Sequence, residues 1–286
     1  MDASMREPSP RSYLFVPGNR PDRFDKAVSS TADVVICDVE DAVPPDEKAQ
    51  SRDNVLEWLK KGASICVRVN GWNTPWFMDD VLAFASHPGV SAIMLPKAET
   101  ANQISELQAH CHPSMKILPI IETARGFDAL GAISSAMGVA RIVFGTVDFQ
   151  LDLGIDGDDL ELLMFRSQIV LASRLAGIES PVDGVTTRIG DPDLVEANAR
   201  RGKRLGFGAM LCIHPNQVAP VHRGYAYTDQ EEAWALRVLA ATQASAGAAV
   251  AVDGKMVDLP VILKAQRIAI ACGHARGDVI QGPRSS

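Results

Sequence analysis

Residues Val34-Val-Ile-Cys-Asp38-Val-Glu40-Asp41 join a short apolar run to a group of carboxylates. The apolar run is too short for a helix, and its aliphatic, β-branched composition is typical of a strand buried on both faces. Seven similar runs recur along the chain: Tyr13–Val16, Ile65–Val69, Ala92–Leu95, Ile117–Ile121, Ile142–Phe144, Pro181–Val182 and Ala209–Ile213. This recurrence predicts a parallel sheet of eight strands.

Amphipathic stretches of helical length separate these runs. They are Asp22–Ser30, Lys48–Lys60, Thr100–His110, Phe127–Met137, Leu160–Ala176 and Asp193–Leu205. Glycines at 62, 138, 177 and 206 follow four of them, where helices should end. Alternating strands and helices of this number match a (β/α)8, or TIM, barrel, which has roughly 250 residues. A doubly wound open sheet is the competitor, but no Gly-x-Gly-x-x-Gly follows the first strand.

The alternation stops after residue 225. A capping box, an Asp-Gly turn between two short runs, and a proline in a first turn predict a helix, a hairpin and a second helix. The elements are a helix from Thr228 and Glu231 to about Ala246, strands Val250–Val252 and Lys255–Val257 around Asp253-Gly254, and a helix over about Pro260–Cys272. We therefore expect a catalytic barrel at residues 1–225 and a C-terminal appendage at 226–286.

Charge and composition exclude several classes of protein. Lys+Arg 28 against Asp+Glu 35 gives a net charge of −7, so neither nucleic acid nor an anionic membrane is expected as partner, because both need a basic face. No apolar run approaches the roughly 20 residues of a membrane span, and the first eleven residues lack the apolar core of a signal peptide. The five cysteines contain no Cys-x-x-Cys pair, which indicates free thiols in a cytoplasmic protein.

Charged residues follow the predicted strands, and the carboxyl ends of barrel strands converge on one face. Glu122 and Asp148 follow adjacent strands, and carboxylates without His or Cys clusters favour a hard cation such as Mg²⁺. Arg68 offers a fixed guanidinium to a substrate carboxylate or a developing oxyanion. Asp183, after the seventh strand, is expected at the same face. A salt-bridge network without metal is the alternative interpretation of these spacings.

Seven separated blocks resemble the citrate lyase β-subunit-like group of the HpcH/HpaI aldolase superfamily. In order they are RSYLFVPGN at 11–19, ADVVICDVEDAV at 32–43, RVN at 68–70, LPK at 95–97, IETA at 121–124, FGTVD at 144–148 and IHPNQ at 213–217. The resemblance implies a TIM barrel and a Mg²⁺-dependent carbon–carbon lyase. Such a lyase cleaves or forms a 3-hydroxyacyl-CoA thioester of the citryl-, malyl- or citramalyl-CoA type, with an acetyl-CoA-like thioester and a 2-keto acid as the other partners.

The resemblance also implies roles for single residues. Glu122 and Asp148 would hold Mg²⁺, and Arg68 would be catalytic because it binds the 2-keto acid and polarises its carbonyl. Residues expected to contact the substrate, including the path of the thioester and CoA, are Phe15, Lys26, Arg68, Glu122, Ile213 and His214. Asp22 stands where the family often has lysine, so the phosphate contacts are expected from other cations.

The segment Lys255-Met-Val-Asp-Leu-Pro260 resembles that of stand-alone members of the family, in which the aspartate reaches a neighbouring subunit. This implies that Asp258 is the catalytic base, that the appendage covers the site of a neighbouring subunit, and that the protein is a homotrimer or a dimer of trimers. An aspartate before a helix with an early proline is also a good N-cap. The sequence leaves both roles open.

Other polar and aromatic residues near the expected site have weaker assignments. Glu40 and Asp41 are expected to support the arginine or metal-bound waters from behind, with direct substrate contact as the alternative. Lys97 is expected to be a lysine at the barrel rim, since nothing predicts the desolvated pocket of a Schiff-base lysine. Trp72 and Trp76 could form a pocket wall or pack at a subunit contact.

Three functional alternatives to a lyase remain open. A 3-hydroxyacyl-CoA thioesterase would use the same residues, with water attacking the thioester carbonyl. A metal-dependent aldolase would act on a free pyruvate-type substrate. A non-catalytic scaffold is the third, and the complete set of Arg68, Glu122 and Asp148 argues against it.

Overall fold

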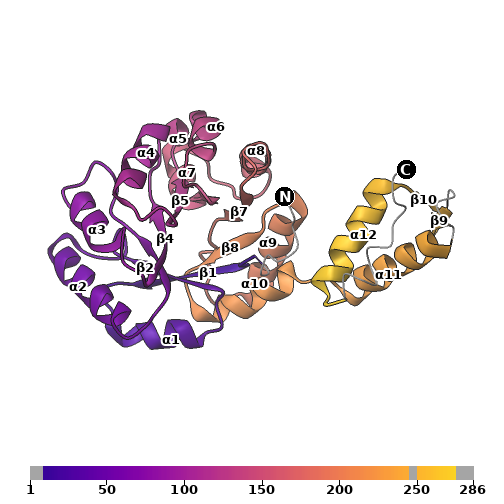
Figure 1. Ribbon diagram of the computed structural model, residues 1–286, viewed down its shortest axis with the longest axis horizontal. Coiled ribbons are helices and arrows are strands. Elements are labelled where there is room, and N and C mark those ends of the chain that lie inside the picture. The colour runs from indigo at the N-terminus through magenta and orange to yellow at the C-terminus, as the bar shows by residue number, and fades with distance from the viewer. Residues whose placement is uncertain (1–8, 245–249, 275–286) are drawn as a thin grey trace. The chain divides into compact units, whose positions relative to one another are not determined.

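The computed structural model describes residues 9–244 and 250–274 of the chain. Eight parallel strands, neighbours in chain order, close into a barrel with helices outside it (Figure 1). The strands are β1 (Ser12–Pro17), β2 (Val34–Asp38), β3 (Ile65–Arg68), β4 (Val90–Leu95), β5 (Lys116–Ile121), β6 (Arg141–Phe144), β7 (Glu179–Asp183) and β8 (Ala209–Cys212). Each predicted run overlaps one of these strands, and the predicted TIM barrel is confirmed.

The barrel helices differ from the predicted ones in four places. They are α1 (Phe24–Ser29), α2 (Lys48–Leu59), α3 (Phe77–Phe84), α4 (Ala101–His110), α5 (Ala124–Asp128), α6 (Leu130–Ser134), α7 (Thr146–Leu153), α8 (Leu160–Leu175), α9 (Pro192–Leu205) and α10 (Val218–Tyr225). Three of these helices, α3, α7 and α10, are not predicted from the sequence. The helix predicted over 127–137 is instead the pair α5 and α6, because Thr123 caps an earlier start by accepting from the Gly126 N–H.

Burial on both faces explains the near-continuous apolar strands. In β2, Ile36 packs inside the barrel with residues of the other strands, such as Cys66 and Met94. Its neighbours Val35 and Cys37 pack outward, in the layer between strands and helices. Because side chains alternate along a strand, both faces must be apolar when both are covered.

The glycines expected to end helices all adopt a left-handed conformation, although α6 already ends at Ser134, before Gly138. Gly62, Gly138, Gly177 and Gly206 all have positive φ. After α9, Gly206 has φ 105° and its N–H donates to the carbonyls of Gly202 and Lys203. This left-handed conformation stops the helix and is one that glycine adopts without strain.

The chain divides into two compact units, a barrel at Ser9–Tyr225 and a C-terminal unit that begins at Ala226. The C-terminal unit contains α11 (Asp229–Ala244), β9 (Val250–Val252), β10 (Lys255–Val257) and α12 (Leu259–Ala271). Asp253 and Gly254 both have positive φ, as the predicted type I′ turn requires. The last residues of the helix predicted to reach about 246 lie outside the described residues.

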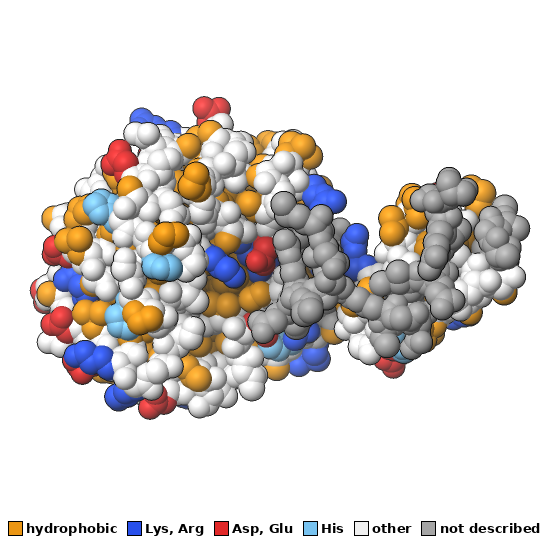
Figure 2. Space-filling view, in the orientation of Figure 1, with side chains coloured by type: hydrophobic (Ala, Val, Ile, Leu, Met, Phe, Trp, Pro, Cys, Tyr) orange, Lys and Arg blue, Asp and Glu red, His pale blue; other side chains and the backbone are white. Residues whose placement is uncertain are grey.

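A small apolar core holds the C-terminal unit together. Val238 of α11 and Ile268 of α12 are buried in it, with alanines between them. In the face of the molecule that Figure 2 shows, acidic and basic side chains are interspersed over the barrel. Among the described helices, none is both long and apolar enough to cross a membrane.

Candidate active site

A cavity of about 630 Å³ opens at the carboxyl ends of the barrel strands, and we call it the mouth cavity. Its lining includes eight of the ten predicted site residues: Phe15, Lys26, Asp41, Arg68, Glu122, Asp148, Ile213 and His214. The ninth, Glu40, contacts Arg68 from behind. The tenth, Asp258, belongs to the C-terminal unit. The fold therefore brings to one cavity side chains that lie in or just after six of the strands, and one from the helix after the first strand.

Arg68 is held rigidly at the end of β3 by Asp38 of the adjacent strand. The Nε and Nη2 groups donate to the two carboxylate oxygens of Asp38 at 2.8 and 2.6 Å. Asp38 also accepts from the backbone N–H groups of Glu40 and Ala42, so the same carboxylate shapes the loop after β2. The guanidinium lies over the Phe15 ring at 4.8 Å. This bidentate pairing fixes both the position and the plane of Arg68.

Asp38 is a site residue that the sequence analysis does not single out. The strand register could have indicated its role, because Asp38 pairs directly with Arg68 between β2 and β3. The predicted site residues on this loop are instead the two acids that follow, Glu40 and Asp41. Of those, Asp41 lines the mouth cavity, as Asp38 does.

Glu40 is buried beside Arg68 and joins it to Lys97. Its Oε2 lies 3.1 Å from Arg68 Nη1, and its Oε1 accepts from Lys97 Nζ at 3.2 Å. Burial raises the pKa of Glu40 while Arg68 opposes the rise. The geometry is that of a carboxylate supporting the arginine, the first of the two roles expected for it.

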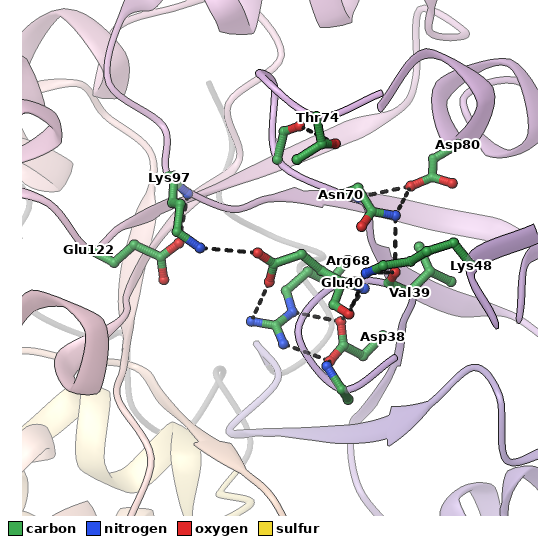
Figure 3. A network of polar contacts seen from close by, with 12 residues as sticks. Asp38, Val39, Glu40, Lys48, Arg68, Asn70, Thr74, Asp80, Lys97 and Glu122 are labelled. Atoms are coloured by element: carbon green, nitrogen blue, oxygen red, sulfur yellow. Dashed lines mark hydrogen bonds and ion pairs between the residues drawn. The ribbon is translucent and has the colours of Figure 1, made fainter. Parts of the chain in front are cut away.

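A buried polar network holds the loop after β2 in place (Figure 3). Lys48 Nζ donates to the carbonyls of Val39 and Glu40 at 3.0 and 2.7 Å. Asn70 Nδ2 donates to the same Val39 carbonyl at 3.0 Å and to Asp80 Oδ2 at 2.6 Å. These contacts satisfy the backbone carbonyls of a sharp, buried loop and keep Glu40 in place.

The two tryptophans lie outside the lining of the mouth cavity. Trp72 packs on Phe77 with ring centroids 4.8 Å apart. Trp76 lies under the ammonium group of Lys48 at 5.3 Å. The pocket-wall interpretation of these residues is therefore wrong, and Trp76 instead contacts the lysine that holds the loop after β2.

Glu122 lies just beyond β5, almost fully buried, with Asp148 nearby on the first turn of α7. Its Oε1 accepts from the Lys97 backbone N–H at 2.7 Å. Burial, reinforced by the negative charges of Asp148 and Glu40, raises the pKa of Glu122 to about 8. Gly145 leaves the necessary space, because a Cβ there would stand 2.5 Å from Glu122 Oε2.

This pair of carboxylates fits a hard divalent cation. A buried carboxylate that resists ionisation is stabilised in its charged form when a cation lies beside it. The described residues contain no group of three or more His, Cys, Asp or Glu side chains able to hold a metal. Mg²⁺ suits such a site, because it takes one or two carboxylates and completes its shell with water and substrate oxygens.

Asp183 does not line the mouth cavity, contrary to expectation. Its carboxylate is buried and accepts from Arg166 Nε of α8 at 3.0 Å. Arg166 also donates to Asp158 Oδ1 at 2.8 Å, and Arg201 contacts the other Asp158 oxygen at 2.9 Å. An arginine from the surrounding helices thus covers the end of β7 and converts Asp183 into part of an internal ion-pair network.

The residues expected along the thioester path all line the mouth cavity. Lys26 of α1 is exposed there, and Arg23 lines the cavity beside it. His214 accepts from the Asn216 N–H and so caps a short 3₁₀ turn. Asp22, at the position noted as unusual, is paired with Arg20 at 2.9 Å. In this first loop and helix, the cations that line the cavity are thus Arg23 and Lys26 rather than Arg20.

Asp258 is an exposed N-cap of α12, whose Oδ1 accepts from the Val261 N–H at 3.2 Å. The capping role predicted for it is therefore present. An exposed carboxylate at a helix start remains accessible to another molecule. Its catalytic role stays a proposal.

Comparison with known proteins identifies the family of the chain. Residues 11–215 match the profile of the HpcH/HpaI aldolase/citrate lyase family. The chain belongs to this family. Among relatives of this HpcH/HpaI member, the citrate lyase subunit beta-like protein of Deinococcus radiodurans is 35% identical, over 90% of this chain and 95% of the relative.

Two further relatives carry names that differ in reaction. The (3S)-malyl-CoA thioesterase of Cereibacter sphaeroides is 34% identical, over 91% of this chain and 94% of the relative. The L-malyl-CoA/beta-methylmalyl-CoA lyase of the same organism is 32% identical, over 90% and 93%. The crystal structure of CitE from Mycobacterium tuberculosis with magnesium, acetoacetate and coenzyme A superposes with a TM-score of 0.81. It has 32% identity and covers 93% of this chain and 99% of that one.

Proposed function

We propose that this HpcH/HpaI member is a Mg²⁺-dependent carbon–carbon lyase that cleaves or forms a 3-hydroxyacyl-CoA thioester of the citryl-, malyl- or citramalyl-CoA type. The products of cleavage would be an acetyl-CoA-like thioester and a 2-keto acid. One observation carries the proposal: a single cavity joins a rigidly held Arg68 to the carboxylates of Glu122 and Asp148. Relatives named as malyl-CoA lyase and citrate lyase subunit beta support it.

The cleavage is a retro-Claisen reaction. A base removes the proton of the 3-hydroxyl group, the C2–C3 bond breaks, and the hydroxyl oxygen becomes the carbonyl of the keto acid. The electron pair of the broken bond passes into the thioester carbonyl as an enolate, which then takes a proton at C2. Arg68 would bind the keto-acid carboxylate and stabilise the developing oxyanion, a role for which its fixed plane suits it.

Glu122 and Asp148 would hold Mg²⁺ at the floor of the cavity. When bound, the ion supplies Lewis-acid polarisation to the oxygen that becomes the keto group and to the neighbouring carboxylate. Glu122 presents its Oε2 beside Gly145, since its Oε1 is engaged by the Lys97 N–H. The protein thus orients one oxygen of this carboxylate in advance.

CoA would lie along Phe15, Lys26, Ile213 and His214. Ile213 is partly exposed in the cavity lining and offers an apolar contact for the pantetheine chain. Lys26 and Arg23 offer positive charge to the phosphates. Arg23 would supply the positive charge that a lysine often supplies in the family at the position of Asp22.

Asp258 would be the base, supplied by a second copy of the chain within a homotrimer or a dimer of trimers. Asp258→Asn keeps a good N-cap but removes the base, so we expect turnover to fall about 10²–10⁴-fold with the melting temperature unchanged. Mixing Asp258→Asn chains with Arg68→Lys chains should restore part of the activity, because some sites then combine both intact residues. A fully active monomer in light scattering would exclude the assignment in trans.

A thioesterase is the second candidate, favoured by the 34% identical (3S)-malyl-CoA thioesterase. The same cation and arginine would then stabilise the oxyanion formed when water attacks the thioester carbonyl. An aldolase on a free pyruvate-type substrate would use the keto-acid part of the site alone.

Product analysis by mass spectrometry separates these reactions. The purified protein is incubated with Mg²⁺ and citryl-, malyl-, citramalyl- or β-methylmalyl-CoA, with EDTA as control. Acetyl- or propionyl-CoA plus a keto acid, lost in EDTA, is the expected result. Free CoA with an intact hydroxy acid would identify a thioesterase, and no turnover of any thioester would exclude both.

A further inference from the structure

Lys97 contacts two carboxylates of the candidate active site, Glu122 through its backbone and Glu40 through its side chain. Its backbone N–H donates to Glu122 Oε1 at 2.7 Å, and its Nζ donates to Glu40 Oε1 at 3.2 Å. Figure 3 shows the side chain between these two carboxylates. Glu40 in turn contacts Arg68, so Lys97 and Glu40 together link the expected metal ligand to the expected substrate-binding arginine.

The backbone of Lys97 is in an unusual conformation. Its φ is +48°, a left-handed value that few non-glycine residues adopt. The turn is pinned to β5, since the next N–H, of Ala98, donates to the Ile120 carbonyl at 3.2 Å. This conformation points the N–H of Lys97 at Glu122. A strained backbone at the edge of a cavity is a reason to look for a functional role.

The charges around Arg68 show what the ammonium group contributes. Arg68 carries one positive charge but contacts two carboxylates, Asp38 and Glu40. These three groups together have a net charge of −1 and would repel an anionic substrate. Lys97 restores neutrality through its ion pair with Glu40. The ammonium also adds positive potential near Glu122 and Asp148, which acts against a divalent cation.

We propose that Lys97 is a positioning residue that offsets the charge of Glu40, so that Arg68 can bind the carboxylate of a 2-keto acid, while its backbone N–H orients Glu122. This inference rests on the proposed function and goes beyond it, because it gives the two ends of Lys97 separate tasks. If only the ammonium group is removed, the affinity for the keto acid should fall, whereas the affinity for Mg²⁺ should stay the same or rise. If Lys97 had only a structural role, its replacement would instead weaken the binding of both ligands.

Calorimetric titration of Lys97→Met, Lys97→Arg and the wild type tests this. MgCl₂ is titrated into metal-free protein, and pyruvate into protein saturated with Mg²⁺. In Lys97→Met the backbone N–H remains, so Mg²⁺ should bind at least as tightly as in the wild type, while pyruvate should bind about tenfold more weakly. Lys97→Arg keeps the charge, and both affinities should stay within about threefold of the wild type.

Lys60→Met is the matched control, because Lys60 is exposed on the C-terminal side of α2 and also pairs with a glutamate, Glu57. It should behave as the wild type. Unchanged pyruvate affinity in Lys97→Met, weaker Mg²⁺ binding, or an equal pyruvate loss in Lys97→Arg would each overturn the inference. A wild type that binds neither probe would overturn the proposed function as well, whereas normal wild-type binding with any of those results would overturn only the role of Lys97.

Discussion

Two buried arginine–aspartate pairs lie at the carboxyl ends of strands in this barrel, Arg68 with Asp38 and Arg166 with Asp183. The chemistry of pairing is similar, since each guanidinium donates its Nε to its aspartate at 3.0 Å or less. Their surroundings differ. The Arg68 side chain is 13% exposed and lines the mouth cavity, whereas that of Arg166 is 2% exposed and bonded to Asp158 on its other side.

The difference lies in the element that supplies the arginine. Arg68 comes from a strand next to its aspartate, so its outer edge faces the cavity. Arg166 comes from α8 and covers its aspartate from outside. The same ion pair can therefore present a cation to a substrate or close one end of a strand. The predictions below separate these two uses.

Arg166→Met should give the largest effect on stability. Removing Arg166 leaves the buried Asp183 carboxylate without its ion-pair partner, while Asp158 keeps Arg201, and an uncompensated buried charge costs about 3–5 kcal/mol of unfolding free energy. Urea unfolding measures this change. The kcat/KM per folded molecule should stay within about threefold of the wild type, and a large loss of kcat/KM without loss of stability would contradict the distinction between the pairs.

Arg68→Lys should act in the opposite way. The charge is kept but the bidentate geometry is lost, so kcat/KM should fall about 10²–10³-fold. Thermal unfolding should change little, because a cation still faces Asp38 and Glu40. If this variant loses stability and keeps its activity, Arg68 is structural like Arg166.

Glu122→Gln tests whether the buried carboxylate is kept for a cation. In metal-free wild type the folded-state pKa of about 8 lies above the ordinary value of 4.5, so the protonated form is favoured in the folded protein. The stability that protonated Glu122 contributes to the folded protein is thus fully present below pH 4.5 and is lost as the pH rises towards 8. Glu122→Gln should therefore be more stable than the metal-free wild type at pH 8, by of the order of 2 kcal/mol, and less so at pH 5.

Mg²⁺ should reverse that order. It competes with the proton on Glu122, so it should raise the melting temperature of the wild type more at pH 8 than at pH 6. The Gln variant should show little response at either pH. Equal responses of the two proteins to Mg²⁺ would place the ion elsewhere.

Asp38→Asn should have the smallest effect. Asn can accept one of the two hydrogen bonds from Arg68, so the guanidinium loses one charge-assisted bond, worth about 1.5–3 kcal/mol. We expect KM for the keto acid in the synthetic direction to rise about tenfold, with a smaller change in kcat. Asp46→Asn, at an exposed position, is the control. An unchanged KM would mean that Glu40 alone positions Arg68.

Local sequence determined the barrel and most of its mouth. Each strand is a short apolar run whose two faces are both buried, and the residue after a strand must point to the same end of the barrel as the others. Position in the chain was therefore enough to place Arg68, Glu122 and Asp148 at one cavity.

Only the tertiary structure decided which charges pair. Arg166 lies within the amphipathic pattern of α8, and nothing local to it shows that it reaches Asp183 across 17 residues of chain. Asp38 and Asp183 both end strands, yet the first supports an arginine that lines the mouth cavity and the second is enclosed. Pairing depends on which side chains from distant elements reach the same point, and the free energy of a buried charge depends on that partner. The contacts of Lys97 with Glu122 and Glu40 arise in the same way, from a turn that tertiary contacts hold in a left-handed conformation.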